Sequence, residues 1–311
     1  MARYVTVSSI GTFPMEVNED THPKDIISKM KIYLRKELNH VLPDKPDIIV
    51  LPEACDRPYH KFPLDKRIKY YLERGNQILD FLKEIAYENN TYITYPAARQ
   101  LEDGTWRNSI QLIDRSGKVC GVYDKNHTVI GETTEAGILP GKDPTVVECD
   151  FGRVGFAICF DLNFEELRRK YEQLRPDILV FSSMYHGGLM ANYWAYSCRM
   201  HIVGAIAALQ SYVISPLGQM VASNSNYYDF LTHTINLDCR VAYLDDNFER
   251  FENAKKKYER KIKIIDPGYI GAVLISSETD EFTIDDVIDE FGIELIDQYF
   301  ERSLQFKQKY V

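Results

Sequence analysis

The segment Phe151–Glu166 joins an apolar run to a polar turn and then to a helical pattern, and it reads FGRVGFAICFDLNFEE. Its apolar run VGFAI is typical of a strand that is buried on both faces. Asp161 and Asn163 are N-cap residue types, and they come just before an expected helix at residues 164–174. Cys159 therefore lies where a strand ends and a helix approaches. Because a helix N-terminus offers unpaired N–H groups and partial positive charge, this position would favour a thiolate and also an oxyanion beside it.

Strands and helices alternate along most of the chain, which predicts an α/β fold with a sheet-on-sheet core and helices outside. The expected strands are residues 4–10, 47–51, 91–97, 109–113, 119–123, 178–182, 202–208, 212–214 and 220–222. The expected helices are residues 23–42, one long helix within 65–90, and residues 191–200.

The last part of the chain is more highly charged than the rest. It contains a charged helix at 247–260, an expected strand at 270–276 and an acidic amphipathic helix at 284–304. We therefore expect residues 1–242 to form the main domain. Residues 243–311 would form a C-terminal extension that packs on this domain or on a partner subunit.

Cys159 alone would usually be a small buried hydrophobe, as most free cysteines are. Two further segments, however, also end an apolar strand with a chemically useful side chain. Glu53 follows the run DIIVLP, and Lys125 follows the run VCGVYD. Each of them alone is most often a solvated surface residue. The presence of all three at strand ends makes it less probable that Cys159 is only a packing residue.

These three blocks resemble the carbon–nitrogen hydrolases of the nitrilase superfamily, whose catalytic set is Glu, Lys and Cys in that order. The motifs that carry the resemblance are LPEA, RNSIQLIDRSGKVCGVYDKNH, LPGKD and FGRVGFAICFD, and it runs from about Arg3 to about Asp238. The resemblance implies a four-layer αββα sandwich for the main domain. It also implies an amidase-like or N-carbamoyl hydrolase-like member of the family.

The resemblance further implies a thioester mechanism. Cys159 would attack an amide carbon, and Glu53 would carry the proton from the thiol to the leaving nitrogen. Lys125 and the backbone N–H of Phe160 would stabilise the oxyanion.

Many relatives add a second glutamate between the lysine and the Pro-Gly turn. Glu132 and Glu135 are the candidates here, and the spacing back from Pro140-Gly141 favours Glu135. Either residue could instead be a solvated loop carboxylate.

Substrate contacts are expected from the loop 182–190, which follows the strand 178–182. Tyr185 and His186 are the candidates, although a surface position is equally consistent with His186. The chain reads CFDLNFEE where many relatives read C-Y-D-x-R-F-P-E, so the arginine and the proline are missing. A contact that relatives make with this arginine is therefore absent or supplied elsewhere.

Composition excludes several other classes of function. The net charge of −9, with Lys255-Lys256-Lys257 as the one basic run, argues against a nucleic-acid partner. The six cysteines show no C-x-x-C pair and no histidine spacing suited to zinc, so neither a disulfide framework nor a structural metal is indicated. The sequence has no glycine-rich phosphate loop, so no nucleotide cofactor is expected. It also has no apolar run of the ~18 residues that a membrane span needs, and the N-terminus enters a strand directly, which favours a cytoplasmic protein.

We therefore predict a hydrolase that cleaves a small linear amide or N-carbamoyl compound and releases ammonia or an amine. Nitrile hydrolysis is the less favoured reaction. The chain could instead be a catalytically silent scaffold, or a subunit that passes ammonia to a partner enzyme. A homodimer or larger homo-oligomer is expected from the family resemblance.

Overall fold

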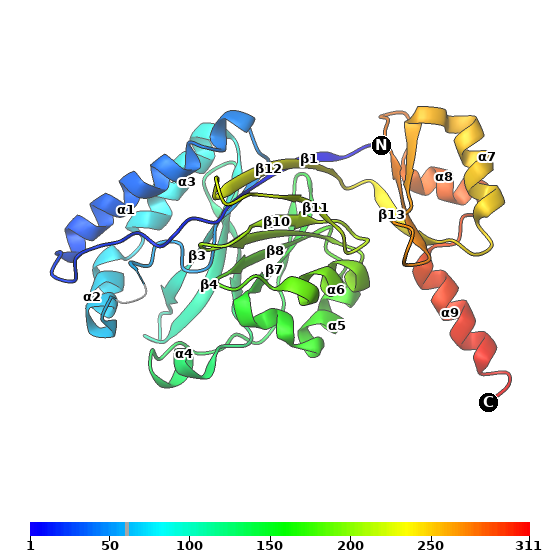
Figure 1. Cartoon of the computed structure of the whole chain (residues 1–311). Helices are drawn as coiled ribbons and strands as arrows, with labels where there is room; N and C mark the ends of the chain where they lie inside the picture. Colours follow the sequence, from blue (N-terminus) through cyan, green and yellow to red (C-terminus); the bar gives the residue numbers. More distant parts are fainter. Residues whose placement is uncertain (60–61) are drawn as a thin grey trace. The chain divides into compact units, whose positions relative to one another are not determined.

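The computed structural model describes residues 1–59 and 62–311, and these residues divide into two compact units. The larger unit is Thr6–His233, and the smaller one combines Met1–Val5 with Thr234–Val311 (Figure 1). The predicted division after residue 242 falls within β13 (Cys239–Tyr243). Because β13 pairs with a later strand of the smaller unit, the structural division lies earlier, between residues 233 and 234.

The larger unit is built on two six-stranded sheets, ordered β12-β1-β2-β3-β4-β5 and β11-β10-β9-β8-β7-β6. The strands in the middle of each sheet are parallel, and those toward the β5, β6 and β11 edges are antiparallel. The first sheet consists of β1 (Tyr4–Ile10), β2 (Ile48–Val50), β3 (Tyr92–Gln100), β4 (Trp106–Ile113), β5 (Val119–Asp124) and β12 (Phe230–Asn236). The second consists of β6 (Val146–Cys149), β7 (Gly152–Ile158), β8 (Ile178–Ser183), β9 (His201–Ile206), β10 (Tyr212–Ile214) and β11 (Met220–Ser223).

Buried hydrogen bonds connect the two sheets. The Ser9 hydroxyl donates to the carbonyl of Gly204 at 2.8 Å. The Ser182 hydroxyl donates to the carbonyl of Leu51 at the same distance, 2.8 Å. These polar links between otherwise apolar inner faces fix how one sheet lies on the other.

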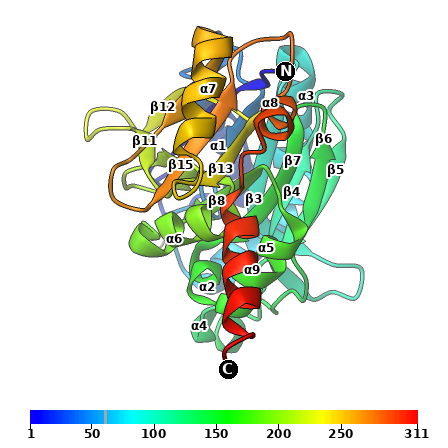
Figure 2. The same ribbon diagram turned by 90° about the vertical axis from the view of Figure 1, so that its right-hand side faces the viewer.

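Helices cover the outer faces of both sheets, as Figures 1 and 2 show. Met30 of α1 (Pro23–Leu38) and Leu82 of α3 (Gln77–Asn89) belong to one apolar cluster with Ile49 of the first sheet. Trp194 of α6 (Gly188–Cys198) packs in another cluster with Phe181 of the second sheet, beside α5 (Glu165–Leu174). The predicted four-layer αββα sandwich is thereby confirmed.

Two expected long helices are each broken at a glycine. The helix predicted within 65–90 is divided at Gly75 into α2 (Leu64–Arg74) and α3. The helix predicted at 284–304 is divided at Gly292 into α8 (Ile284–Phe291) and α9 (Ile296–Lys307). Both glycines have positive φ angles, +46° and +62°, which L-residues with side chains rarely adopt. Each glycine therefore ends a helix where the periodicity alone predicted that it would continue.

The smaller unit contains a three-stranded antiparallel sheet ordered β13-β15-β14, and helices that bury apolar side chains against it. Its other elements are α7 (Phe248–Tyr258), β14 (Ile262–Ile265) and β15 (Ala272–Ser277). Among the described residues, every helix falls short of the length and apolar character that a membrane span requires.

Candidate active site

A buried lysine lies at the centre of the candidate site. Lys125 follows β5 directly, and its side chain is 1% exposed. Its ammonium donates to Glu53 at 3.0 Å and to Glu132 at 2.8 Å. Burial alone would lower the pKa of Lys125, but the two carboxylates and the nearby Cys159 raise it above its usual value. Lys125 is therefore held as a cation in a nearly dry environment.

Two backbone hydrogen bonds hold Lys125 in place. Its N–H donates to the carbonyl of Asn108 at 2.8 Å, and its carbonyl accepts from the N–H of Gly141 at 2.7 Å. A side chain at Gly141 would lie only 2.3 Å from the carbonyl oxygen of Asp124. The Pro-Gly turn of the LPGKD motif thus allows a close approach of the backbone just behind the lysine.

Glu53 lies at the end of β2 and is also buried. The next residue, Ala54, has a φ angle of +51°, a left-handed conformation that is uncommon for a residue with a side chain. The N–H of Cys55 then donates to the carbonyl of Pro96 in β3 at 3.0 Å. This turn directs the Glu53 carboxylate toward Lys125.

The second glutamate beside the lysine is Glu132, in the short helix α4 (Ile130–Thr134). The spacing of the motif favoured Glu135, but the geometry places the other candidate, Glu132, against the lysine, and the catalytic role of either residue stays a prediction. Glu135 follows the helix and is exposed, and among the described residues it makes no hydrogen bond to Lys125. The Glu132 carboxylate also accepts from the N–H of Val129 at 2.8 Å, which fixes it at the start of α4.

Asn108 is a member of the cluster that the motif analysis did not single out. It lies in β4, and its side-chain amide donates to Glu53 at 2.9 Å and to Glu132 at 3.1 Å. The signal was present in the RNSIQ motif, because strand alternation places Asn108 on the same face as Ile110 and Leu112, which are completely buried. A buried amide on such a face needs polar partners.

Cys159 lies at the end of β7 in a strained conformation. Its φ angle is +48°, and it opens a short 3₁₀ helix, Cys159–Asn163. The expected N-cap roles of Asp161 and Asn163 are not observed, because the following helix begins only at Glu165 and Phe164 is its N-cap residue. A positive φ at the nucleophile position turns the chain sharply between strand and helix.

Asp161 instead points into the protein, where it is fully buried. It accepts from the N–H of Ile158 at 2.9 Å, the N–H of His127 at 2.8 Å and the Tyr123 hydroxyl at 2.8 Å. Asp161 follows Cys159, and its carboxylate accepts from the residue that precedes Cys159. It also accepts from Tyr123 and His127, so it links the cysteine turn to the end of β5. The His127 ring nitrogen Nδ1 also lies 3.2 Å from this carboxylate.

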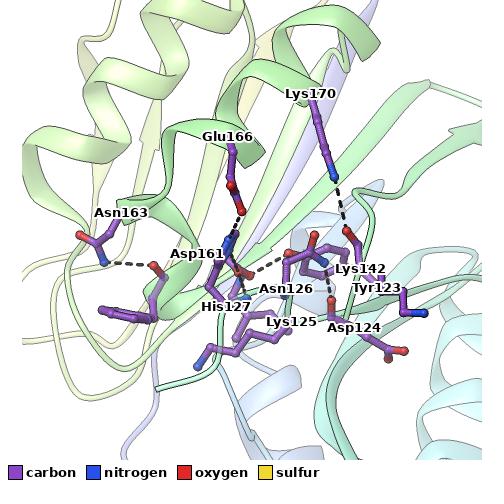
Figure 3. Close-up of polar contacts among 12 residues, drawn as sticks. Tyr123, Asp124, Lys125, Asn126, His127, Lys142, Asp161, Asn163, Glu166 and Lys170 are labelled. Carbon is purple, nitrogen blue, oxygen red and sulfur yellow. Dashed lines mark hydrogen bonds and ion pairs between the residues drawn. The ribbon is translucent and has the colours of Figure 1, made fainter. Parts of the chain in front are cut away.

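His127 extends this network to α5, as Figure 3 shows. Its Nε2 lies 2.9 Å from Glu166, and its ring stacks on Phe164 at 3.8 Å. Burial alone would lower the pKa of His127, but its contacts with Asp161 and Glu166 raise it above its usual value. The residue two positions after Lys125 thus connects the lysine segment to the helix after the cysteine.

The expected ready thiolate is not supported by the surroundings of Cys159. Burial and the negative charge of Glu53 raise the pKa of the Cys159 thiol to about 12, although Lys125 and hydrogen bonding by Ser183 and Met184 act in the other direction. Burial and the charge of Glu53 therefore act against the thiolate form of Cys159, while Lys125 favours it.

The three residues expected to contact substrate lie in different environments. Phe160 is 36% exposed, and its N–H lies in the first turn of the 3₁₀ helix, where no intrahelical acceptor is available. Burial raises the pKa of Tyr185 to about 12 with a contribution from Cys159, which places this phenol near the thiol. His186 accepts from the N–H of Gly188 at 3.3 Å, and in the described part of the chain it has no hydrogen bond to Glu53, Lys125 or Cys159.

A pocket of about 290 Å³ lies beside the cluster, and Asn108 and Glu132 form part of its wall. Its size is near the lower end for small-molecule sites. Across residues 1–59 and 62–311, no group of three or more His, Cys, Asp or Glu side chains is arranged to hold a metal ion.

Comparisons with known proteins identify the family and the fold. The family model for carbon–nitrogen hydrolases matches residues 26–242, so the match ends where the main domain was predicted to end. A relative from Staphylococcus lugdunensis named hydrolase in agr operon is 27% identical over 210 residues, which cover 62% of this chain and 88% of that protein. The human omega-amidase NIT2 is 24% identical over 56% of this chain and 71% of its own length.

A 2-oxoglutaramate amidase from Bacillus subtilis is 24% identical over 52% of this chain, and the match spans only 59% of that relative. Among solved structures, yeast Nit3, a nitrilase-superfamily member, has a TM-score of 0.63 at 16% identity, covering 83% of this chain and 95% of its own. An amidase from Nesterenkonia has a TM-score of 0.61 at 14% identity, with 80% and 95% coverage. The structural matches establish the shared fold, and the family model covers most of the sequence. The chain therefore belongs to the carbon–nitrogen hydrolases of the nitrilase superfamily.

Proposed function

We propose that this protein hydrolyses the carbon–nitrogen bond of a small linear amide or N-carbamoyl compound through a thioester on Cys159. The observation that carries the proposal is the buried cluster of Lys125 with Glu53 and Glu132, next to a thiol whose pKa responds to Glu53 and Lys125. Amidase names among the relatives favour amides over nitriles.

Glu53 is the proton carrier in this scheme. As the Cys159 sulfur bonds to the amide carbon, its proton passes to the Glu53 carboxylate, and the carbonyl electrons move to oxygen. When the tetrahedral intermediate collapses, the carbon–nitrogen bond breaks and Glu53 returns the proton to the leaving nitrogen. Water then gives a proton to Glu53 and attacks the thioester carbon. The carbon–sulfur bond breaks, which releases the acid, and Glu53 returns the proton to the Cys159 sulfur.

Lys125 and the backbone N–H of Phe160 stabilise the oxyanion that forms in both steps. Because Lys125 is held charged by two carboxylates, it needs no proton transfer during the reaction. Glu132 and Asn108 are positioning residues, since they contact Lys125 and Glu53 rather than the reacting atoms. Tyr185 lies near the thiol and is proposed to line the substrate side, together with His186.

The test is a panel of short aliphatic amides and N-carbamoyl amino acids, with released ammonia as the readout. Acid quenching during turnover, followed by peptide mass spectrometry, is expected to find the acyl group on the peptide that contains Cys159. Cys159→Ala should give neither ammonia nor the acyl peptide. If wild-type protein turns over no member of the panel and Cys159 is never acylated, the proposal fails and a silent binding member becomes the better description.

A further inference from the structure

Each of the two sheets of the larger unit has an edge strand that carries a cysteine. Cys120 lies in β5, the edge strand of the first sheet, and Cys149 lies in β6, the edge strand of the second. Cys120 is exposed and Cys149 is half-buried. Their sulfurs lie 3.5 Å and 4.0 Å from the carbonyls of Leu112 and Val147, which are weak contacts. The proposed chemistry uses neither thiol, so both are available for another reaction.

The two edge strands lie side by side and run in opposite directions. Cα atoms of the two strands approach within 8 Å. The Thr145 hydroxyl, just before β6, donates to the carbonyl of Val122 at 3.1 Å. Further along β6, Val147 lies against Gly121, and a Cβ atom at this glycine would come within 2.3 Å of a Val147 methyl carbon. Residue numbers thus rise along β6 as they fall along β5, and the missing side chain at Gly121 allows the close approach.

The contact on the other side of the cysteines is an ion pair. Arg115, in the turn before β5, donates to the carboxylate of Asp150, the residue after β6, at 2.7 Å and 3.2 Å. Cys120 and Cys149 therefore lie between this ion pair and the glycine contact. Because this stretch is held at both ends, the antiparallel alignment places the two cysteines opposite each other.

A bulge in β5 releases Cys120 from the alternation of its neighbours. Leu112 of β4 pairs with Gly121, and Ile113 pairs with Val119, so Cys120 is an extra residue in β5. Bulges re-aim a side chain and bend the strand locally. The bulge can therefore turn the Cys120 side chain toward β6, as a disulfide requires, because its two Cβ atoms must lie about 3.5–4.5 Å apart.

The ionisation of Cys149 agrees with this placement. Burial raises the pKa of Cys149 to about 12, and the charge of Cys120 contributes to the rise. Burial likewise raises the pKa of Cys120 to about 11. Little thiolate is therefore present at neutral pH, and thiol–disulfide exchange at this site is slow. The pair is suited to a slow cross-link and not to fast redox sensing.

We propose that Cys120 and Cys149 are a redox site, at which a small-molecule disulfide such as glutathione disulfide forms a reversible cross-link between the edges of the two sheets. Cys120 loses its proton, and its sulfur attacks one sulfur of the small disulfide, which releases one small thiolate. Cys149 then loses its proton and attacks the Cys120 sulfur of the mixed disulfide, which releases the second. The two leaving thiolates take up the two protons. Two protein thiols are thus oxidised, and one small disulfide is reduced to two thiols.

The cross-link closes the segment 120–149, which carries Lys125 and Glu132 of the candidate site. Closing this segment restricts the unfolded chain and so stabilises the folded one. The spacing of the cysteines along the chain does not indicate this pair, because the two strands meet only in the fold. The inference does not depend on the proposed role of Cys159.

The first experiment oxidises the native protein with excess glutathione disulfide at mildly alkaline pH, and then blocks the remaining thiols with N-ethylmaleimide. Peptide mass spectrometry without reduction should find the peptides of Cys120 and Cys149 joined, and dithiothreitol should separate them. Cys159→Ala should form the same cross-link, because the candidate nucleophile takes no part in it. If Cys120 carries only glutathione, or stays unmodified, and no joined peptide forms, the proposal is overturned.

The second experiment compares thermal unfolding of the oxidised and reduced proteins. The cross-linked protein should melt roughly 5–10 °C higher, as expected for a loop and a unit of this size. Cys120→Ser and Cys149→Ser should each abolish this difference, and the exposed position of Cys120 makes its variant the safer one to fold. Cys239→Ser is the matched control, because Cys239 is another half-buried strand cysteine, and it should keep the difference. A joined peptide without a higher melting temperature, or a difference that persists in both variants of the pair, overturns the proposal.

The third experiment tests reversibility. Reduced and oxidised protein are brought separately to the same ratio of glutathione disulfide to glutathione, and the cross-linked fraction is measured in each. The two fractions should converge and should rise with the ratio. Fractions that remain different at long times, or that ignore the ratio, contradict a reversible redox site.

Discussion

The two strands that deliver Glu53 and Cys159 hold their residues by different means. On the first sheet, the acid and the cation are fixed by side-chain contacts, because Lys125, Glu53, Glu132 and Asn108 bind one another in a buried cluster. On the second sheet, the cysteine is fixed by its backbone, with a φ angle of +48°. The charged groups are thus set by mutual attraction and the nucleophile by chain geometry.

This difference has a consequence for substitution. Removing one member of the buried cluster leaves the others with an unpaired charge, so the chemistry should suffer first. Removing the support of the cysteine turn should cost folding stability, because Asp161 accepts hydrogen bonds from three donors there.

The largest expected effect is on the nucleophile itself. Cys159→Ala should lower amide turnover by roughly 10⁴-fold or more, because loss of a covalent nucleophile removes the whole reaction path. The rate of ammonia release measures this loss of turnover. Cys120→Ser is the control, since Cys120 is an exposed thiol, and it should stay within about twofold of wild type. Equal loss in both variants would point to misfolding rather than chemistry.

Glu53→Gln should separate thiol ionisation from catalysis. Turnover should fall by about 10³-fold, because the proton carrier is lost. The Glu53 charge helps to hold the pKa of the Cys159 thiol at about 12. At pH values below this pKa, iodoacetamide should therefore alkylate Cys159 faster in Glu53→Gln than in wild type. Each unit by which the pKa falls gives about tenfold more thiolate.

Peptide mass spectrometry across pH measures this alkylation, with the five other cysteines as internal references. An unchanged or slower alkylation profile in Glu53→Gln would show that Glu53 does not act on the thiol.

The two glutamates near the lysine should behave differently. Glu132→Gln should lower kcat by about 10²-fold, because Lys125 loses one of its two carboxylate partners. Glu135→Gln should change kcat by less than about threefold, because Glu135 is exposed and does not contact the lysine. Steady-state kinetics on one amide measures both. The reverse order would restore the assignment that the motif spacing favoured.

On the cysteine side, Asp161→Asn should lower the free energy of unfolding by about 2–4 kcal/mol, since it removes a buried acceptor that serves several donors. For a unit of this size, the melting temperature should fall by roughly 5–10 °C. Asp143→Asn is the matched control, because its side chain is 83% exposed, and it should change stability by less than about 0.5 kcal/mol. A melting temperature equal to that of wild type would remove Asp161 from its supporting role.

The smallest expected effect is a pH dependence from His127. Its pKa is raised in the folded state above the ordinary value of 6.5, against the effect of burial, by Asp161 and Glu166. The stabilisation is therefore fully present below 6.5 and is lost as the pH rises through the folded-state pKa. Urea unfolding at several pH values should show this loss in wild type, and His127→Gln should reduce it. If the free energy of unfolding changes with pH equally in wild type and in His127→Gln, the pH dependence comes from other groups.

Much of the site could be predicted because its main residues are marked by their neighbours along the chain. Each of the residues Glu53, Lys125 and Cys159 follows an apolar run, and all three strand ends are seen in the structure. The expected homo-oligomer, the cytoplasmic location and the roles of Tyr185 and His186 stay predictions. The choice between Glu132 and Glu135 could not be made from spacing, because it depends on where α4 begins relative to Lys125.

The sequence by itself determined the α/β alternation, the family and the order of acid, lysine and cysteine along the chain. Only the tertiary structure decided that Asn108 joins the cluster, that Asp161 turns inward and that burial and Glu53 raise the pKa of the Cys159 thiol. The physical reason is that periodicity and motifs report on neighbours along the chain. Burial and ion pairing depend on groups such as Glu53 and Lys125, which are 72 positions apart and meet only when the sheets are formed.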